Sequence, residues 1–275
     1  MLAQDALHAV AGAGVAGLVC VGVLGIVALI VFAVILSAKH ERERREKLEA
    51  LAAARGGQFY ADFPGIHQVL PAYPLLERGH SRRAFNVASA SLELGGIPCA
   101  CLWGEYQYKI TTSNGKRTQT TTYTHGFVAL APQLVVPEEL TVRREGFLDK
   151  IGEFFGADDI DFESSEFSKR FHVKCSDRRF AFDLFDPRMM EFFLAGEPSS
   201  IHLLGNWMLF DRGSFRWEPA NFEAELAWID AFLARVPRHV RAARLPKELH
   251  ARDPVLNPAH GSAGDSRGAA SGETA

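Results

Sequence analysis

The chain has 275 residues, of which 47% are hydrophobic and 23% are charged, and its formal net charge is -3. This near-neutral charge excludes the strong electrostatic attraction on which nucleic-acid binding depends, so we expect no nucleic-acid partner. The four cysteines include no C-x-x-C pair, which excludes a zinc ribbon, and we expect neither a metal nor another cofactor.

The N-terminal stretch AGAGVAG (11–17) contains the G-x-G-x-x-G spacing of dinucleotide-binding loops. Such a loop requires a preceding strand, an amphipathic helix after it and an acidic residue about 20 positions later. Here no charged residue occurs between Asp5 and Lys39. A spanning helix needs roughly 20 consecutive apolar residues. We therefore predict a transmembrane helix over 10–38 instead of a nucleotide site.

The flanks of this span predict its orientation. Residues 1–9 contain no Lys or Arg, whereas KHERERREK (39–47) contains five. Because basic residues remain on the cytoplasmic side, we expect residues 1–9 outside the cell and the main domain in the cytoplasm of a cell-membrane protein. Small residues with i, i+4 spacing allow the span to self-associate into a homo-oligomer. These candidate span contacts are Gly12, Ala13, Ala16, Gly17 and Cys20.

The rest of the chain predicts an α+β fold. Residues 39–56 form a charged juxtamembrane helix that Gly56-Gly57 ends, and its Leu48 and Leu51 make an apolar stripe that can dock on the domain. Residues 57–245 are predicted to form the cytoplasmic domain. The Gly/Ala/Ser-rich segment 246–275 is predicted to be a disordered tail.

An antiparallel meander is predicted over 82–132, with its turns at Gly95-Gly96 and Asn114-Gly115. The segment ELTVRRE (139–145) is predicted to add a fourth strand. A hairpin is also expected over 200–213, turning near Gly205-Asn206.

Helices are expected to pack against this sheet. The predicted helical segments are 145–159, RRFAFDLF (178–185), the segment that Asp186-Pro187 opens and Gly196 ends, and a final helix before Pro237. In the final helix, apolar residues recur at i, i+4, i+7 and i+11, which places Phe222, Leu226, Ile229 and Leu233 on one face.

Three segments, LEALAAARGGQFY, SRRAFNVASASLELGGIPCACLWGEYQY and FESSEFSKRFHVKCSDRRFAFDLFDPRMMEFFLA, resemble a family of uncharacterised bacterial proteins. The resemblance covers about residues 45–240. It implies one or more membrane spans before a cytoplasmic domain of unknown function, and it supplies no activity, substrate or catalytic residue.

The best candidate binding surface is the hairpin region of the meander, where aromatic, hydroxyl and imidazole groups can line a groove. Its residues are Trp103, Glu105, Tyr106, Tyr108, Tyr123 and His125. The alternative is a solvated sheet face, which the Thr-rich segment 118–124 suits equally well.

Three other clusters have structural explanations that we prefer. Asp159, Asp161 and Glu163 alternate and can share a strand face, as Ca²⁺ or Mg²⁺ ligands do, but solvated acidic residues are the simpler interpretation. The basic residues Arg178, Arg179 and Arg188 are expected to form ion pairs rather than a phosphate site. Cys99 and Cys101 point to one face of a strand and are expected to be buried, reduced thiols.

No G-x-x-x-x-G-K-[ST], H-E-x-x-H or G-x-S-x-G motif occurs in the chain. We assign no catalytic residues and favour a membrane-anchored, non-catalytic module that binds a protein partner or a ligand. Two alternatives stay open: an enzyme whose site lies near the Tyr/His/Glu hairpin, and a structural subunit of a membrane complex that assembles through its span.

Overall fold

The computed structural model describes residues 2–144, 159–253 and 255–256, with side chains from Leu24 onward. The chain divides into two compact units, residues 1–47 and 48–275. The α+β class predicted from the sequence is confirmed, with a long apolar N-terminal helix followed by an antiparallel sheet and its helices. The helix predicted over 145–159 falls almost wholly outside the described residues, as does the tail from residue 257 onward.

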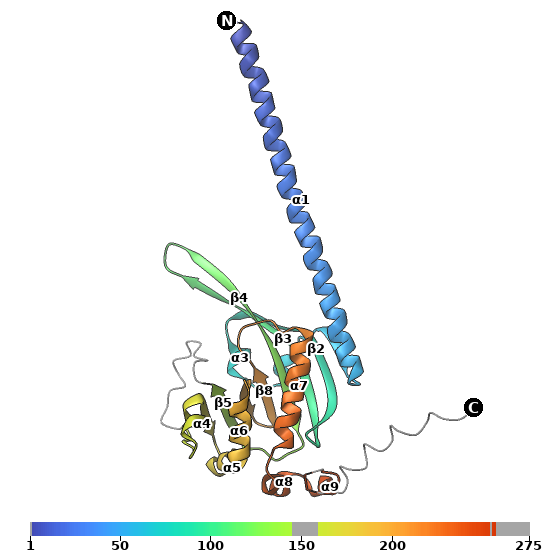
Figure 1. Ribbon diagram of the computed structural model, residues 1–275, viewed down its shortest axis with the longest axis vertical. Helices are drawn as coiled ribbons and strands as arrows, with labels where there is room; N and C mark the ends of the chain where they lie inside the picture. Colours follow the sequence, from blue (N-terminus) through green and yellow to red (C-terminus); the bar gives the residue numbers. More distant parts are fainter. Residues whose placement is uncertain (1, 145–158, 254, 257–275) are drawn as a thin grey trace, which may run out of the picture. The chain divides into compact units, whose positions relative to one another are not determined.

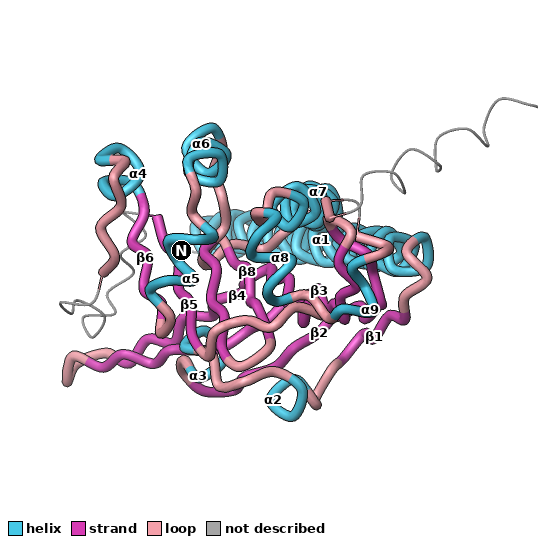
Figure 2. The backbone as a smooth tube through the Cα atoms, turned by 90° about the horizontal axis from the view of Figure 1, so that it is seen from below, coloured by secondary structure: helices cyan, strands magenta, loops and turns pink. Residues whose placement is uncertain are grey.

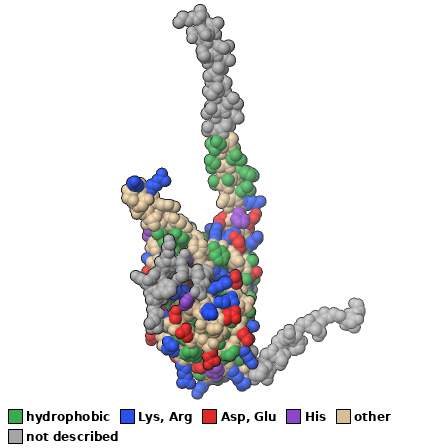
Figure 3. All heavy atoms as spheres, turned by 60° about the vertical axis from the view of Figure 1, so that its left-hand side comes forward, with side chains coloured by type: hydrophobic (Ala, Val, Ile, Leu, Met, Phe, Trp, Pro, Cys, Tyr) green, Lys and Arg blue, Asp and Glu red, His purple; other side chains and the backbone are tan. Residues whose placement is uncertain are grey.

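The first helix, α1 (Leu2–Ala54), supplies one segment long and apolar enough to cross a membrane. Its large apolar side chains from Leu24 to Leu36 are 49% to 68% exposed on every side of the helix. A helix that is apolar all round is stable only when something apolar surrounds it, as a bilayer does. Figure 3 shows this apolar surface along the helix. The candidate span contacts, Gly12 to Cys20, have side chains outside the described residues.

The second unit is built on an eight-stranded sheet in the order β1-β2-β3-β4-β8-β7-β5-β6, in which every neighbouring pair is antiparallel (Figure 1). Its strands are β1 (Gln58–Asp62), β2 (His80–Leu94), β3 (Ile97–Ser113), β4 (Thr118–Pro132), β5 (Glu139–Arg144), β6 (Phe171–Cys175), β7 (Ser200–Leu204) and β8 (Trp207–Asp211).

The predicted meander forms as β2, β3 and β4, with both turns at the predicted dipeptides, Gly95-Gly96 and Asn114-Gly115. The hairpin expected over 200–213 forms as β7 and β8. The strand predicted at 139–145 also forms, as β5, but it does not lie beside β4. Instead β8 pairs with β4 through residues 127–130, and β5 lies between β7 and β6. Sequence order predicts neighbours along the chain, whereas the later hairpin takes the place beside β4.

Helices cover both faces of the sheet, and Figure 2 shows α4, α6 and α7 on one side with α2 and α3 on the other. The helices of the second unit are α2 (Ile66–Val69), α3 (Pro74–Glu77), α4 (Ser165–Arg170), α5 (Arg178–Leu184), α6 (Pro187–Ala195), α7 (Pro219–Ala234), α8 (Arg238–Arg244) and α9 (Lys247–His250). As predicted, Asp186 caps α6 by accepting a hydrogen bond from the Met189 backbone N–H at 2.8 Å.

The larger core lies between one sheet face and the helices α4 to α8. The four apolar positions predicted for α7 are all buried there, at 0% to 2% exposure. The last turns of α1 belong to this core, since Leu48 and Leu51 are buried in it, as the apolar stripe predicted. A smaller core fills the opposite face of β2, β3, β4 and β8 beneath α2 and α3, around Tyr73, Tyr106 and Phe127.

The folded chain continues past residue 245, so the boundary predicted for the disordered tail is too early. The short helix α9 follows, and Asp253 is 1% exposed. Its carboxylate accepts a hydrogen bond from the buried guanidinium of Arg241. The Gly/Ala/Ser content of the tail gave no sign of this ion pair, because it joins two residues that the fold brings together.

Candidate functional site

The second unit presents a polar sheet face where β5, β7 and β8 lie side by side. The register pairs Thr141 with His202 across β5 and β7, and His202 with Leu209 across β7 and β8. Cross-strand partners share a face, so alternate residues of each strand join them. The polar residues assembled in this way are Glu139, Thr141, Arg143, Ser200, His202 and Asp211.

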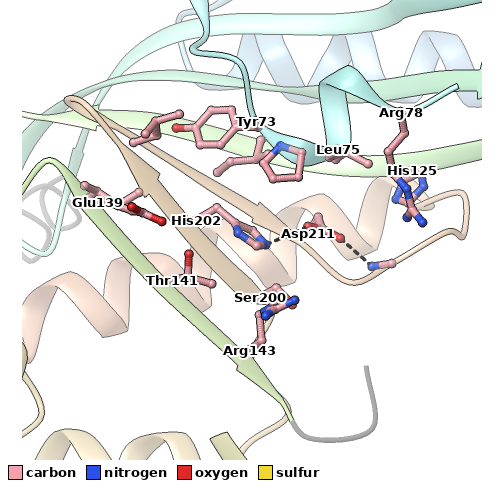
Figure 4. A pocket seen from close by; sticks show the side chains of 15 residues that line it. Tyr73, Leu75, Arg78, His125, Glu139, Thr141, Arg143, Ser200, His202 and Asp211 are labelled. Carbon is pink, nitrogen blue, oxygen red and sulfur yellow. Dashed lines mark hydrogen bonds and ion pairs between the residues drawn. The ribbon is translucent and has the colours of Figure 1, made fainter. Parts of the chain in front are cut away.

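A cavity of about 120 Å³ lies between this face and the segment 73–78 that contains α3 (Figure 4). It is several times larger than the roughly 10–15 Å³ that one water molecule occupies on the same measure. One wall is apolar and comes from Tyr73, Pro74, Leu75 and Leu209. Apolar walls with a few convergent polar groups are the usual character of a small-molecule site.

Two tyrosines hold α3 in place over the sheet. The Tyr73 hydroxyl donates to the Trp207 carbonyl at 2.7 Å, and the Tyr106 hydroxyl donates to the Leu76 carbonyl at 2.6 Å. Burial raises the pKa of Tyr73 well above its usual value and the pKa of Tyr106 to about 12. Both hydroxyls therefore stay protonated and keep donating, which fixes the roof of the cavity.

His202 and Asp211 lie at the centre of the cavity floor (Figure 4). The His202 Nε2 atom lies 3.9 Å from Asp211 Oδ2, while Asp211 Oδ1 accepts the Gly213 backbone N–H at 2.8 Å. Burial lowers the pKa of His202; the Asp211 carboxylate opposes that effect, and Arg143 adds to it. At neutral pH the imidazole is therefore uncharged and offers one donor and one acceptor.

The structure divides the six residues of the predicted binding surface between the two faces of the sheet. The register places Tyr106 opposite His125 and Tyr108 opposite Tyr123, so these four share one face. Trp103 and Glu105 alternate with them and point to the other face. Because side chains alternate between the two faces of a strand, this division could have been predicted from the positions of these residues along β3.

Five of the six side chains are buried, so they do not form an exposed groove. Trp103 packs in the larger core, and all except Tyr123 are at most 2% exposed. The solvated sheet face, which was the alternative interpretation, is also absent at these five positions, since helices and the segment after β8 cover both faces.

Glu105 accepts hydrogen bonds from Asn86 at 2.7 Å and from Arg216 at 2.6 Å. His125 alone of the six lines the cavity, and its ring stacks on Tyr108.

The strands β5 and β7 supply most of the cavity's polar groups. The sequence alone did not single out these residues as a candidate site. The alternation Glu139, Thr141, Arg143 and the alternation Ser200, His202 are signals of a polar sheet face. What the sequence did not reveal is that β5 and β7 become neighbours, because some 60 residues separate them along the chain.

One residue of each remaining charged cluster, Asp159 and Arg179, has an oppositely charged partner. Asp159 Oδ2 lies 3.1 Å from His172 Nδ1, and within the described residues no group of three His, Cys, Asp or Glu side chains is arranged to hold a metal ion. Arg179 lies 3.9 Å from Asp183 within α5. Cys99 and Cys101 are buried free thiols in the larger core, and burial raises the pKa of Cys101 to about 12.

Comparison with known proteins gives one distant likeness in structure. No family model and no curated protein matches the sequence. A solved structure, described as the crystal structure of the mycobacterial trehalose monomycolate transport factor A, TtfA, superposes with a TM-score of 0.48 at 13% identity. The match covers 71% of this chain and 97% of that one.

Proposed function

We propose that this protein is a membrane-anchored, non-catalytic binding module, whose cavity between α3 and the strands β5, β7 and β8 takes a small organic ligand. The observation that carries the proposal is the cavity itself, with an apolar wall on one side and hydrogen-bonding groups on the other. This lining suits a molecule with an apolar body and a polar end.

Binding is favoured over catalysis by the state of the reactive groups. A thiol attacks as the thiolate, and burial raises the pKa of all three described cysteines. In the cavity, His202 Nε2 and Asp211 Oδ2 are 3.9 Å apart, beyond hydrogen-bond distance, so the carboxylate does not orient the imidazole in this structure. One oxygen of the Asp211 carboxylate, Oδ1, accepts the backbone N–H of Gly213 instead.

The anchoring part of the proposal rests on α1. Its 24–36 segment is apolar on every side, and the charged residues begin at Lys39. With the basic residues of 39–47 on the inner side, the N-terminus lies outside and the second unit in the cytoplasm of a bacterial cell.

The ligand proposal is tested by filling the cavity. Thr141→Phe places a ring on the cavity floor, whereas Thr112→Phe places the same ring on the exposed hairpin and serves as the matched control. The full-length proteins are purified in mild detergent, and retained small molecules are extracted and identified by mass spectrometry. We expect a compound enriched in the wild type and in Thr112→Phe that is lost from Thr141→Phe. Identical profiles for all three proteins would refute a ligand role for this cavity.

The anchor is tested with matched Val→Arg pairs. Val27→Arg/Val31→Arg charges the middle of the apolar segment, at about 2.5–3.5 kcal/mol per residue in a membrane, whereas Val69→Arg/Val135→Arg charges two exposed positions of the second unit. After an alkaline carbonate wash, the wild type and the second pair are expected in the membrane fraction and the first pair in the supernatant. Release of the wild type by the wash would show that α1 does not anchor the chain.

A further inference from the structure

The hairpin of β3 and β4 extends beyond the rest of the sheet as a two-stranded ribbon (Figure 1). The pairing of β2 with β3 stops at Lys109, and the pairing of β8 with β4 starts at Phe127. Between these limits β3 and β4 pair with each other in continuous register as far as Ser113 and Thr118. Figure 3 shows basic side chains at the tip of this ribbon.

The outer edge of β4 over residues 118–124 has no neighbouring strand within the described chain. At one end the edge is closed by the Gly126 backbone N–H, which donates to the Phe215 carbonyl at 3.3 Å. At the other end the chain turns back at Asn114, whose backbone N–H donates to the Arg117 carbonyl at 3.2 Å. Backbone groups of successive strand residues face opposite edges, so the residues in phase with Gly126 face outward. Four residues therefore present a backbone donor and acceptor to the outside: Thr118, Thr120, Thr122 and Thr124.

Edge strands of native sheets are ordinarily protected by a charge, a proline or a bulge. The segment TQTTTYT contains no charged residue and no proline, and its register with β3 has no bulge. Its side chains are β-branched or aromatic at six of seven positions, the types that favour strands. An unprotected edge of this kind is a template for an added strand.

We propose that the edge of β4 pairs with the same edge of a second copy of this chain, antiparallel and centred on Thr121. Two-fold symmetry about that residue places Thr118 opposite Thr124, Gln119 opposite Tyr123, and Thr120 opposite Thr122. The dimer closes, because the same stretch of β4 is used once in each copy.

The composition of the segment makes it complementary to itself. Threonines facing each other across antiparallel strands can hydrogen-bond, as Thr111 and Thr120 already do within the ribbon, with their hydroxyls 2.8 Å apart. No charge inside the segment faces a like charge of the second copy. The basic residues at the turn, Lys116 and Arg117, lie outside the paired stretch.

The first test uses single cysteines in a Cys20→Ala background, which removes the thiol of the span and leaves the buried ones of the second unit. In the proposed register only Thr121→Cys places the new thiol beside its own copy. At about 3.3 Å per residue, Gln119→Cys thiols are separated by roughly 13 Å, beyond the 7 Å that a disulfide tolerates. Full-length proteins in detergent are treated with a mild oxidant and run on a non-reducing gel.

A covalent dimer with Thr121→Cys and not with Gln119→Cys or Thr118→Cys supports the proposal. Absence of the dimer at position 121, or equal crosslinking at all three positions, overturns it. If the edge binds a different protein instead of a second copy, Thr121→Cys gives no covalent dimer.

The second test uses charge pairs at the exposed positions 120 and 122, which face each other between copies. Thr120→Lys/Thr122→Glu creates two attractive pairs, while Thr120→Glu/Thr122→Glu and Thr120→Lys/Thr122→Lys create two repulsive ones. Light scattering of the full-length protein should show a dimer for the first variant and dissociation about tenfold easier for the other two. Both repulsive variants are expected to weaken the dimer although they change the net charge in opposite directions. An effect of the proposed register can therefore be distinguished from an effect of overall charge. Equal dimerisation of all three variants, or a monomeric wild type, overturns the proposal.

Discussion

Breaking the buried ion pair at the C-terminal end of the fold is expected to lower the urea concentration at which the second unit unfolds. Arg241 and Asp253 are both fully buried as side chains, and the guanidinium also donates to the Gly95 carbonyl at 2.7 Å and to the Leu233 carbonyl. One cation thereby links α8, the end of α7, the β2–β3 turn and the segment after α9. Burial lowers the pKa of Arg241, and Asp253 opposes that effect.

The magnitude follows from what each substitution leaves behind. Asp253→Ala leaves a buried guanidinium without its counter-ion, and Arg241→Ala leaves a buried carboxylate. Breaking a buried pair in this way costs about 3–5 kcal/mol. Arg241→Met/Asp253→Leu removes both charges and keeps apolar volume, so it is expected to be more stable than either single variant. Truncation after residue 245, where the sequence predicts the domain to end, should cost at least as much as Asp253→Ala, because it also removes the core contacts of Leu249 and Leu256.

The assay is urea unfolding of the full-length protein in detergent, followed by tryptophan fluorescence. A loss of 3–5 kcal/mol corresponds to a fall in melting temperature of about 10 °C for a unit of this size, which a parallel thermal melt should reproduce. If Asp253→Ala unfolds within about 1 kcal/mol of the wild type, the ion pair does not hold the C-terminal segment, and the reasoning is wrong.

Three further outcomes are expected. Gly126→Ala should lower the free energy of unfolding by about 1–3 kcal/mol, since its new Cβ would lie 2.0 Å from Trp217 Cγ. Gly65→Ala is the control, because the nearest atom to its new Cβ is 3.8 Å away, and it should leave stability almost unchanged in the same urea assay. Because burial lowers the folded pKa of His202 below 6.5, its contribution to stability is complete above pH 6.5 and is lost as the pH falls. The stability difference between wild type and His202→Asn should therefore shrink from pH 7 to pH 5, by at most about 1.4 kcal/mol per pH unit, and a constant difference would contradict the assignment. Iodoacetamide at pH 8 should leave the buried thiols of Cys99, Cys101 and Cys175 unmodified in the native protein and should label them in urea. Mass spectrometry can detect the labelling, and modification of any of the three thiols in the native protein would argue against their burial.

Local chemistry made much of the fold predictable. The dipeptides Gly95-Gly96 and Asn114-Gly115 set the turns of the meander. Asp186 and Pro187 set the start of α6, and the apolar spacing of α7 predicted its buried face. The apolar run at the N-terminus likewise predicted a helix without any knowledge of its surroundings. Each of these signals acts over a few residues, so the sequence contains it in full.

The candidate site depends on contacts between segments that are distant in the sequence, so it became visible only in the folded structure. The pairing of β5 with β7 brings Thr141 beside His202, and the pairing of β4 with β8 brings Asp211 beside Phe127. The covering helices decided that Tyr106 and Tyr108 are buried rather than exposed, although their alternation along β3 was already in the sequence. The local elements and the apolar N-terminal helix could therefore be predicted from the sequence, because helix and strand periodicity are local. The order of strands and the cavity they enclose required the fold, because burial and cross-strand neighbours are properties of the assembled sheet.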